Sequence, residues 1–232
     1  MKILAIDTSG QQAGAAIVDE YITIGEIMIN AQSGPKTWHH SEILMPAIER
    51  LMNLCGQNIE DMDYIAYTAG PGSFTGLRIG AATALGLSRG INRPAIGVPT
   101  LDALAYNVFG AGFEDCVVPL MDARRGQVYG AVYQGGERVT EYLALPIEEM
   151  LGYVTQGPVV FLGDGVDVHR EIIRTKFPLA IFASQNANRQ RPASVGLCAI
   201  KNFAHLPKSP PDDLVELIYV RDPQAVRAKM AP

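Results

Sequence analysis

The sequence contains few cysteines and no long apolar run. Its three cysteines, Cys55, Cys116 and Cys198, are odd in number and far apart, which argues against a disulfide framework and favours a reducing compartment. No Cys/His cluster has the spacing of a zinc site. No apolar stretch approaches the length of a membrane span, and the first residues lack the apolar region of a signal peptide. The sequence therefore predicts a cytoplasmic protein that does not contact a membrane.

The chain also lacks an excess of basic residues. Lysine and arginine number 19 against 24 aspartate and glutamate residues, which gives a formal net charge of −5. Domains that hold nucleic acid through bulk charge are basic, so we expect any contact with RNA to be mainly indirect, through a partner that carries most of the phosphate contacts. A hydrophobic content of 48% in 232 residues is typical of a globular protein with a sizeable core.

The first half of the chain alternates apolar runs with helical patterns. The run from Ile3 to Ile6 predicts a buried strand that ends at Asp7. The patterns that follow predict two strands, a helix, a strand, a helix, a strand and a helix, at residues 13–18, 21–29, 41–54, 64–68, 75–88, 95–98 and 100–108. Ser41 is the expected N-cap of the first helix, and Ser73 or Thr75 that of the second.

The second half repeats this order, with elements expected at residues 117–121, 127–133, 138–145, 159–162, 165–176, 179–182 and 194–203, and a short helix that begins at Pro146. Two copies of β-β-β-α-β-α-β-α favour a duplicated α/β fold over two unrelated domains. We expect an N-terminal lobe at residues 1–105, a C-terminal lobe at 106–205, and a Pro-rich link with a C-terminal tail at 206–232. Within that last part, residues 214–220 are expected to form a final strand or docking segment.

The helix expected at 75–88 has one side nearly free of side chains, formed by Gly76, Gly80 and Ala84 with the neighbouring Ala81, Thr83 and Gly86. An interior glycine destabilises a helix by about 1 kcal/mol relative to alanine, so this pattern needs a physical reason. Two explanations remain open. The helix packs closely on its own sheet, or the bare side admits a helix from another chain. Its Gly-rich entry loop has the character of an anion site at a helix N-terminus.

The order of elements resembles the two-lobed actin-like/Hsp70-like ATPase fold, which is RNase H-like in each lobe. Particular motifs narrow the resemblance to the TsaB (YeaZ) family. They are Ile3–Ser9, His40–Glu42, Gly70–Gly80, Gly97–Leu101, Asp122–Tyr129 and the ending Tyr219–Arg221. The match runs over nearly the whole chain, and the blocks Gly70–Gly80 and Asp122–Tyr129 are the most specific.

The resemblance implies a role in making N6-threonylcarbamoyladenosine next to the anticodon of tRNA. In that family the related TsaD transfers the threonylcarbamoyl group and works with the ATPase TsaE, while TsaB is the non-catalytic partner that TsaD needs. We therefore expect a TsaD heterodimer, contact with TsaE through that complex, and a homodimer when the chain is alone. ATP would be used by the wider complex, with no cofactor bound tightly by this chain.

The resemblance also places the partner interface on the two helices at 41–54 and 75–88, which form a four-helix arrangement with TsaD. The broad apolar girth of the first helix and the bare side of the second agree with this expectation. The residues expected in the interface are Ser41, Leu44, Met45, Ile48, Met52, Thr75, Gly76, Ile79, Gly80, Thr83 and Ala84.

Catalytic machinery is not expected. TsaD holds its metal on two histidines four residues apart, and the matching positions here are Thr100 and Leu104, so the resemblance predicts no metal and no catalytic residue. Asp7, Thr8 and Ser9 take the place of the first phosphate loop of the ATPase superfamily, where we expect a vestigial site or simply a turn that closes a strand.

The second phosphate loop is expected to be crowded, because long side chains, Arg124 and Arg125, follow Asp122 and Ala123. They obstruct a phosphate, although they could also bind an anion or pair with acids at an interface. Two other functions remain as alternatives. One is an independent ATP-dependent enzyme that uses Asp7, and the other a glycoprotease-like peptidase for which Ser73 is the available nucleophile.

Overall fold

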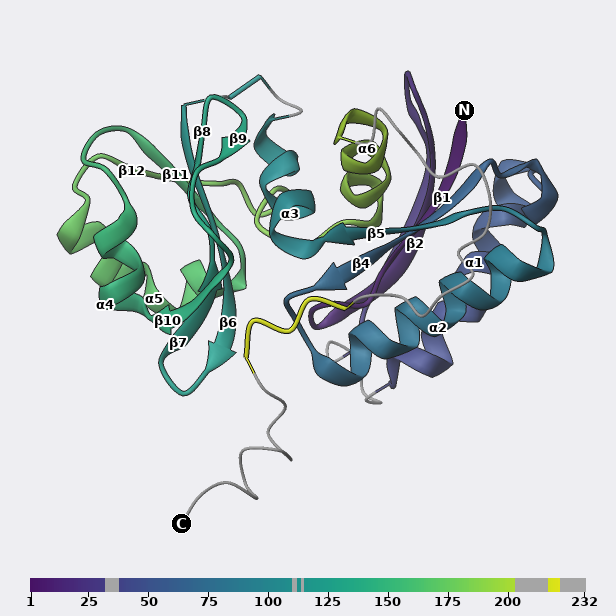
Figure 1. The fold of residues 1–232 in the computed structure, drawn as a ribbon, viewed down its shortest axis with the longest axis horizontal. Coiled ribbons are helices and arrows are strands. Elements are labelled where there is room, and N and C mark those ends of the chain that lie inside the picture. Colours follow the sequence, from purple (N-terminus) through teal and green to yellow (C-terminus); the bar gives the residue numbers. More distant parts are fainter. Residues whose placement is uncertain (32–37, 110–111, 114, 203–216, 222–232) are drawn as a thin grey trace, which may run out of the picture. The chain divides into compact units, whose positions relative to one another are not determined.

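The computed structural model describes residues 1–31, 38–109, 112–113, 115–202 and 217–221. The chain divides into two compact units, one containing Met1–Tyr106 and Gln190–Leu217 and the other Asn107–Arg189 and Ile218–Pro232 (Figure 1). Most of the Pro-rich link and tail expected at 206–232, and the start of the segment expected at 214–220, lie outside the described residues.

The first unit is a five-stranded sheet with helices on both faces. Its strands are β1 (Lys2–Asp7), β2 (Gln12–Asp19), β3 (Thr23–Asn30), β4 (Tyr64–Gly70) and β5 (Ala95–Pro99). They lie in the order β3-β2-β1-β4-β5, with β1, β4 and β5 parallel and the first hairpins antiparallel. The fully apolar strand β1 is central, and its residues from Ile3 to Asp7 are all buried.

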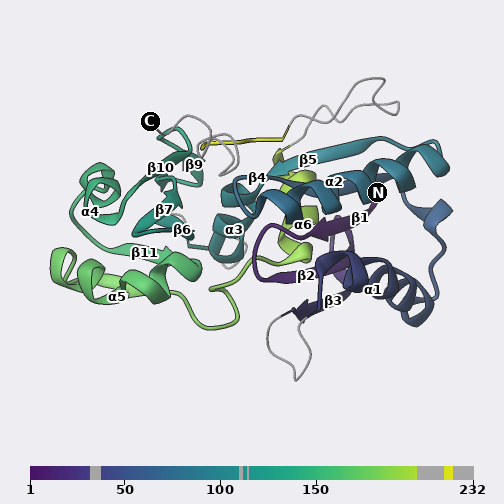
Figure 2. The same cartoon turned by 90° about the horizontal axis from the view of Figure 1, so that it is seen from below.

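The helices of this unit are α1 (His40–Cys55), α2 (Phe74–Gly90), α3 (Thr100–Phe109) and α6 (Pro192–Asn202), with the short η1 (Ile59–Asp61). Helices α1 and α2 lie side by side (Figures 1 and 2). Side chains alternate between the faces of a strand. Ile3 and Ala5 therefore pack with α3 and α6, whereas Ile6 lies beneath α2 on the opposite face.

The second unit repeats the topology of the first. Its strands are β6 (Cys116–Arg124), β7 (Gln127–Gly130), β8 (Tyr133–Gln134), β9 (Glu137–Arg138), β10 (Leu143–Pro146), β11 (Val159–Leu162) and β12 (Ala180–Phe182). The main path β10-β7-β6-β11-β12 corresponds strand by strand to the order of the first sheet, and β6, β11 and β12 are parallel. Its helices are α4 (Ile147–Met150), η2 (Leu151–Tyr153) and α5 (Asp164–Lys176). The duplicated fold predicted from the sequence is therefore present.

Three local predictions differ from the structure. The N-cap of α1 is His39 rather than Ser41, and the Glu42 carboxylate accepts the His39 N–H at 2.8 Å. The strand expected at 138–145 is split into β9 and β10, because the Thr140 hydroxyl takes up the Val132 N–H at 3.0 Å in place of a ladder bond. Residues 217–220 are irregular rather than a strand.

The boundaries of the units also differ from the expected ones. Helix α6 was expected in the C-terminal lobe at 106–205, but it packs on β1 and β2 of the first sheet. Its N-terminal end is tied there by Glu26 on β3, whose carboxylate accepts hydrogen bonds from the Arg191 guanidinium and, at 2.9 Å, from the Ala193 N–H. The segment before and within α6 thus returns to the first unit.

Candidate functional site

The outward side of α2 includes a stripe of mostly small residues. Thr75 and Ala82 are exposed, Ile79 and Thr83 are half-buried, and Gly86 is exposed. These positions recur at intervals of three and four residues, so they form one stripe along the helix. We call this stripe, together with exposed Ser41 and Met45 on the neighbouring α1, the helix-pair surface.

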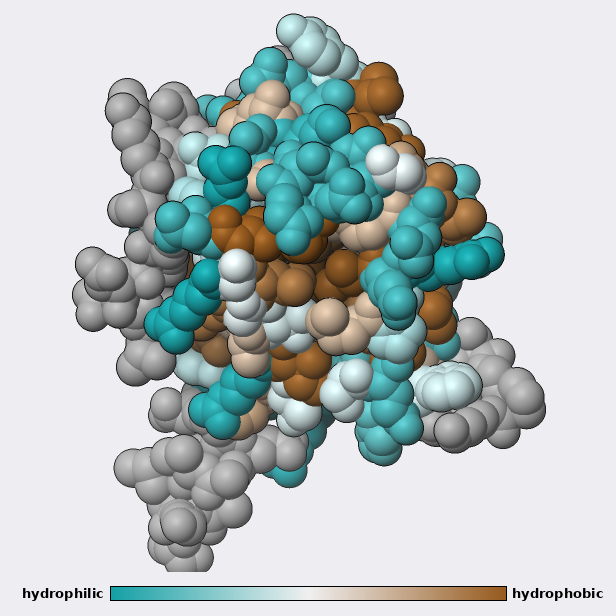
Figure 3. All heavy atoms as spheres, turned by 90° about the vertical axis from the view of Figure 1, so that its right-hand side faces the viewer, coloured by the Kyte–Doolittle hydropathy of each residue, from teal (hydrophilic) through white to brown (hydrophobic). Residues whose placement is uncertain are grey.

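Hydrophobic residues gather on one face of the first unit. Figure 3 views the molecule from the right-hand side of Figure 1 and shows apolar residues at the centre of that face, bordered by hydrophilic ones. Met45 is 47% exposed, although it lies on the same side of α1 as the buried Ile48 and Met52. Exposed apolar groups that gather in this way mark interaction sites on many proteins.

Several residues expected in the partner interface instead belong to the core of the first unit. On α1 these are Leu44, Ile48 and Met52, which are at most 7% exposed and therefore offer a partner almost no surface. The apolar girth of α1 was wide because one side packs on β2 and β3 and another turns toward α2. Ser41 and Met45 remain accessible.

Gly76 and Gly80 are explained by packing within the unit. A Cβ atom at Gly76 would overlap the backbone oxygen of Thr8, and one at Gly80 would overlap the Thr8 hydroxyl. Ala84 is fully buried on the same side of α2. Of the two explanations open for the bare side of this helix, close packing on its own sheet therefore accounts for these three residues.

Gly86 has no such explanation. It is exposed, and a Cβ atom there would meet nothing within 4 Å. The sequence places Gly86 beside the row of small residues on this helix, but the residues expected in the interface did not include it. Six residues at 100° each place Gly86 about 120° around the helix from Gly80, measured the shorter way. The fold of this unit gives no reason for a glycine at this interior helical position.

The loop after β1 is closed by hydrogen bonds within the unit. Asp7 Oδ1 accepts bonds from the Ser9 N–H at 2.8 Å and the Ser9 hydroxyl at 2.7 Å. The Thr8 hydroxyl donates to the Gly76 carbonyl at 2.8 Å, and the Ser73 N–H donates to the Ser9 carbonyl at 2.7 Å. A Cβ atom at Gly72 would lie 2.6 Å from the Ser9 oxygen. Gly72 and Gly76 thus let the Gly-rich loop at the start of α2 lie close to Thr8 and Ser9.

Asp7 is the one strongly perturbed acid in the described residues of this loop. Its side chain is 3% exposed, and burial raises the pKa of its carboxyl to about 6, against the opposing effect of the bonds from Ser9 and Thr68. Its second oxygen, Oδ2, has no hydrogen-bond partner among the described residues. The carboxyl therefore organises the turn through one oxygen, while the other stays buried.

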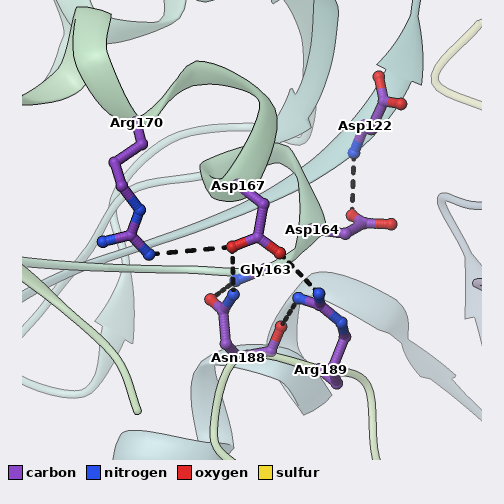
Figure 4. A network of polar contacts seen from close by, with 7 residues as sticks. All are labelled: Asp122, Gly163, Asp164, Asp167, Arg170, Asn188 and Arg189. Atoms are coloured by element: carbon purple, nitrogen blue, oxygen red, sulfur yellow. Dashed lines mark hydrogen bonds and ion pairs between the residues drawn. The ribbon is translucent and has the colours of Figure 1, made fainter. Parts of the chain in front are cut away.

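The corresponding loop of the second unit is occupied in the same way (Figure 4). Asp164 Oδ1 accepts the Asp122 N–H at 3.0 Å, and Asp122 Oδ1 accepts the Arg124 N–H at 2.8 Å. Asn188 Oδ1 accepts the Gly163 N–H at 2.7 Å. Burial raises the pKa of the Asp164 carboxyl. The backbone groups at the ends of β6 and β11 are thus bonded to the unit's own side chains.

A second layer of polar contacts fixes these side chains. The Asn188 amide donates to Asp167 Oδ1 at 3.1 Å, and the Arg189 guanidinium donates to Asp167 Oδ2 at 2.6 Å. Arg170 lies 3.8 Å from the same carboxylate (Figure 4). The Asn188 side chain thus joins the Gly163 backbone to Asp167, and this network holds the loop in place.

These contacts decide what the two loops can do chemically. A phosphate loop binds its anion through free backbone N–H groups. Here the N–H groups of Ser9, Asp122 and Arg124 already donate to aspartate side chains. These three N–H groups therefore hold together each unit's own strands and helices.

Other catalytic constellations find little support in the described part of the chain. His40 lies beside Gly76, close to Ser73, a proximity that the sequence did not indicate. Burial lowers the pKa of His40, while its hydrogen bonds with the backbone of Gln11 and Thr8 oppose that shift. The Ser73 hydroxyl accepts the Gly76 N–H at 3.2 Å and so caps α2, as the sequence predicted. Both side chains thus have structural partners.

Among the described residues, no three His, Cys, Asp or Glu side chains come together as a metal site requires. The expected lack of a metal stays a prediction. None of the described helices combines the length and apolar character of a membrane span. The three cysteines are unpaired, in agreement with the sequence.

Comparison with known proteins adds independent information. Residues 36–229 match the family "TsaD: tRNA N6-adenosine threonylcarbamoyltransferase". A Bacillus subtilis protein named "tRNA threonylcarbamoyladenosine biosynthesis protein TsaB" is 35% identical over 179 residues, which are 75% of each chain. An Escherichia coli protein of the same name is 35% identical over 137 residues, covering 59% of this chain and 57% of that one.

Solved structures agree at the level of the fold. A Pseudomonas aeruginosa protein described as similar to peptidase YEAZ superposes with a TM-score of 0.74 at 22% identity, covering 95% of this chain and 99% of that chain. A structure named YeaZ from the same organism gives a TM-score of 0.69 at 24% identity, with 86% and 91% covered. The two-unit actin-like fold predicted from the sequence is thereby confirmed.

Proposed function

Because this chain belongs to the TsaB family of tRNA threonylcarbamoyladenosine biosynthesis proteins, we propose that it is the non-catalytic subunit that activates TsaD. In this proposal it binds TsaD through the helix-pair surface, and TsaE joins through the resulting complex. Two copies pair through the same surface when TsaD is absent, since a two-fold interface uses one patch on both partners. The chain itself binds no metal and no cofactor tightly, and ATP is used by the wider complex.

The observation that carries the proposal is the position of Gly86. An exposed interior glycine destabilises α2 by about 1 kcal/mol relative to alanine, and nothing within the unit requires its small size. Together with Ala82 and Thr83 it leaves room for the backbone of another helix to approach closely. Met45 on α1 adds an exposed apolar side chain beside this stripe. A helix of another chain fits this surface better than an extended peptide or a small ligand.

The non-catalytic role is supported by the two occupied loops. Hydrolysis of ATP needs phosphate oxygens to meet free N–H groups, a cation, or both. In this chain the carboxylates of Asp7, Asp122 and Asp164 accept the loop N–H groups instead. We infer that the actin-like fold is retained here as the body that carries the helix-pair surface.

The proposal is tested by co-purification with TsaD, using Gly86→Arg. The arginine enters open space in the free protein, so the variant is expected to fold as the wild type does, but its side chain fills the stripe and should abolish both TsaD binding and self-pairing. Gly152→Arg is the matched control, because Gly152 is also exposed with open space around it but lies in the second unit.

The two variants are compared by size-exclusion chromatography with light scattering, alone and mixed with TsaD, after circular dichroism has shown that both are folded. Loss of the heterodimer with Gly86→Arg and its retention with Gly152→Arg are the expected results. If Gly86→Arg still forms both the heterodimer and the homodimer, the interface does not use the outward side of α2 and the proposal is wrong.

A further inference from the structure

The hairpin that joins β6 to β7 has an unusual backbone. Arg124, Arg125 and Gly126 all have left-handed φ angles, of 66°, 56° and 71°. Arg124 pairs with Gln127 across the ladder, so Arg125 and Gly126 form the two-residue turn. Such turns favour asparagine, aspartate or glycine at the first central position, because other side chains crowd the following carbonyl. The backbone therefore gives no reason for arginine at position 125.

The base of this hairpin is firmly held. Asp122 accepts the Arg124 N–H and lies 3.3 Å from the Arg124 guanidinium. From the other end of the sequence, Arg221 donates to the Ala123 carbonyl at 3.1 Å and to the side chain of Gln127. In Figure 1 the yellow segment that contains Arg221 comes down beside the end of β6. These contacts hold both strands at the base of the hairpin, and so fix the position of its tip, Arg125 and Gly126.

Arg125 itself has no charge partner among the residues that the structure describes. It is exposed, and no ion pair or hydrogen bond joins its side chain to any residue that the structure describes. The adjacent Arg124 side chain is 66% exposed and pairs with Asp122. In a chain with a net charge of −5, this tip is a basic site held in a conformation that disfavours its own residue type. Residues kept in strained backbone conformations concentrate at functional sites.

We propose that Arg125, assisted by Arg124, binds phosphate groups of the tRNA backbone when the chain is part of the TsaD complex. This inference rests on the proposed function, which supplies tRNA as the substrate. RNA is favoured over an acidic protein surface because an exposed arginine gains little from a single carboxylate in water, whereas a contact with a nucleic-acid phosphate also releases condensed counterions. This proposal adds a direct contact between the chain and tRNA to the mainly indirect contact with RNA that the composition predicts.

The test replaces Arg125 with asparagine in the full-length chain. Asparagine adopts left-handed backbone angles more readily, so the variant should be more stable, with a Tm for the second unit about 2–4 °C higher. The TsaD complex that contains it should bind tRNA about tenfold more weakly, and the slope of log Kd against log salt concentration should fall by about one. A purely structural arginine would not give a more stable protein with weaker RNA binding.

Arg174→Asn is the control, since it removes one exposed positive charge from the same unit and leaves the hairpin unchanged. The proposal holds if Arg125→Asn weakens tRNA binding and the control does not. It is overturned if Arg125→Asn leaves affinity and salt slope unchanged, or if the two variants lose affinity equally. If Arg125→Asn forms the TsaD complex normally and that complex binds tRNA as the wild type does, this inference alone is contradicted. If the wild-type chain does not bind TsaD, this inference and the proposed function are both overturned.

Discussion

The same substitution at two glycines of α2, one buried and one exposed, should change stability in opposite directions. Gly76→Ala places a methyl group against the Thr8 backbone oxygen, at a distance shorter than the 3.0 Å below which Cβ atoms are essentially never found from another heavy atom. The Thr8 backbone cannot rotate away as a side chain can, so α2 must shift away from β1. That shift strains the hydrogen bond between the Thr8 hydroxyl and the Gly76 carbonyl. Overpacking of this kind destabilises a protein by about 1–3 kcal/mol.

Gly86→Ala should have the reverse effect. The new methyl group meets nothing within 4 Å, so only the helical preference of alanine remains, which is worth about 1 kcal/mol. That corresponds to a Tm about 2–4 °C higher for the first unit. The gain in the free protein should be accompanied by weaker binding to TsaD, because the methyl group lies where the partner helix is expected.

Both variants are measured by urea and thermal unfolding, followed by circular dichroism, with the wild type in the same buffer. The expected order of stability is Gly86→Ala, wild type, Gly76→Ala. If Gly86→Ala lowers stability, the outward side of α2 is packed within the unit and the helix-pair surface does not exist as described. If Gly76→Ala is neutral, the close approach of α2 to Thr8 is wrong.

Three further predictions follow from the two loops. The pKa of Asp7 is raised from 3.8 to about 6, so folding favours the protonated form of this carboxyl. The protonated carboxyl therefore contributes about 3 kcal/mol to the free energy of unfolding below pH 3.8, and this contribution is lost as the pH rises through 6. Asp7→Asn should remove this dependence in urea unfolding between pH 4 and 7, and an unchanged pH profile would contradict it. Asn188→Ala leaves the buried Gly163 N–H without an acceptor and should destabilise the second unit by about 1–3 kcal/mol, whereas an unaltered urea midpoint would show that water replaces the amide. Calorimetry of the isolated chain with Mg-ATP should show no tight binding and no turnover, and micromolar affinity would instead favour the ATP-dependent alternative.

Sequence reasoning succeeded where the pattern is local. The apolar run at β1, the hydroxyl cap at Ser73 and the Gly-rich entry to α2 each depend on a few neighbouring residues, and all are present. The repeated order of strands likewise follows from hydrophobic runs that each unit must bury.

It failed where the outcome depends on contacts between distant residues. A helix that is apolar over a wide arc does not reveal which part faces its own sheet, so Leu44 and Ile48 were assigned to an interface although they are buried. The return of α6 to the first unit depends on Glu26, 165 residues from Arg191. Gly76 and Gly86 are both glycines of the same helix, and the sequence does not show that Gly76 packs against Thr8 while Gly86 faces open space.

The central claim is that this chain supports TsaD through its helix-pair surface and performs no chemistry itself. The most direct measurement is threonylcarbamoylation of tRNA by purified TsaD and TsaE supplied with ATP and threonylcarbamoyl-adenylate, with the wild-type chain, with folded Gly86→Arg, and with neither. The account predicts modification with the wild-type chain and only background in the other two reactions. Equal modification in all three would contradict it.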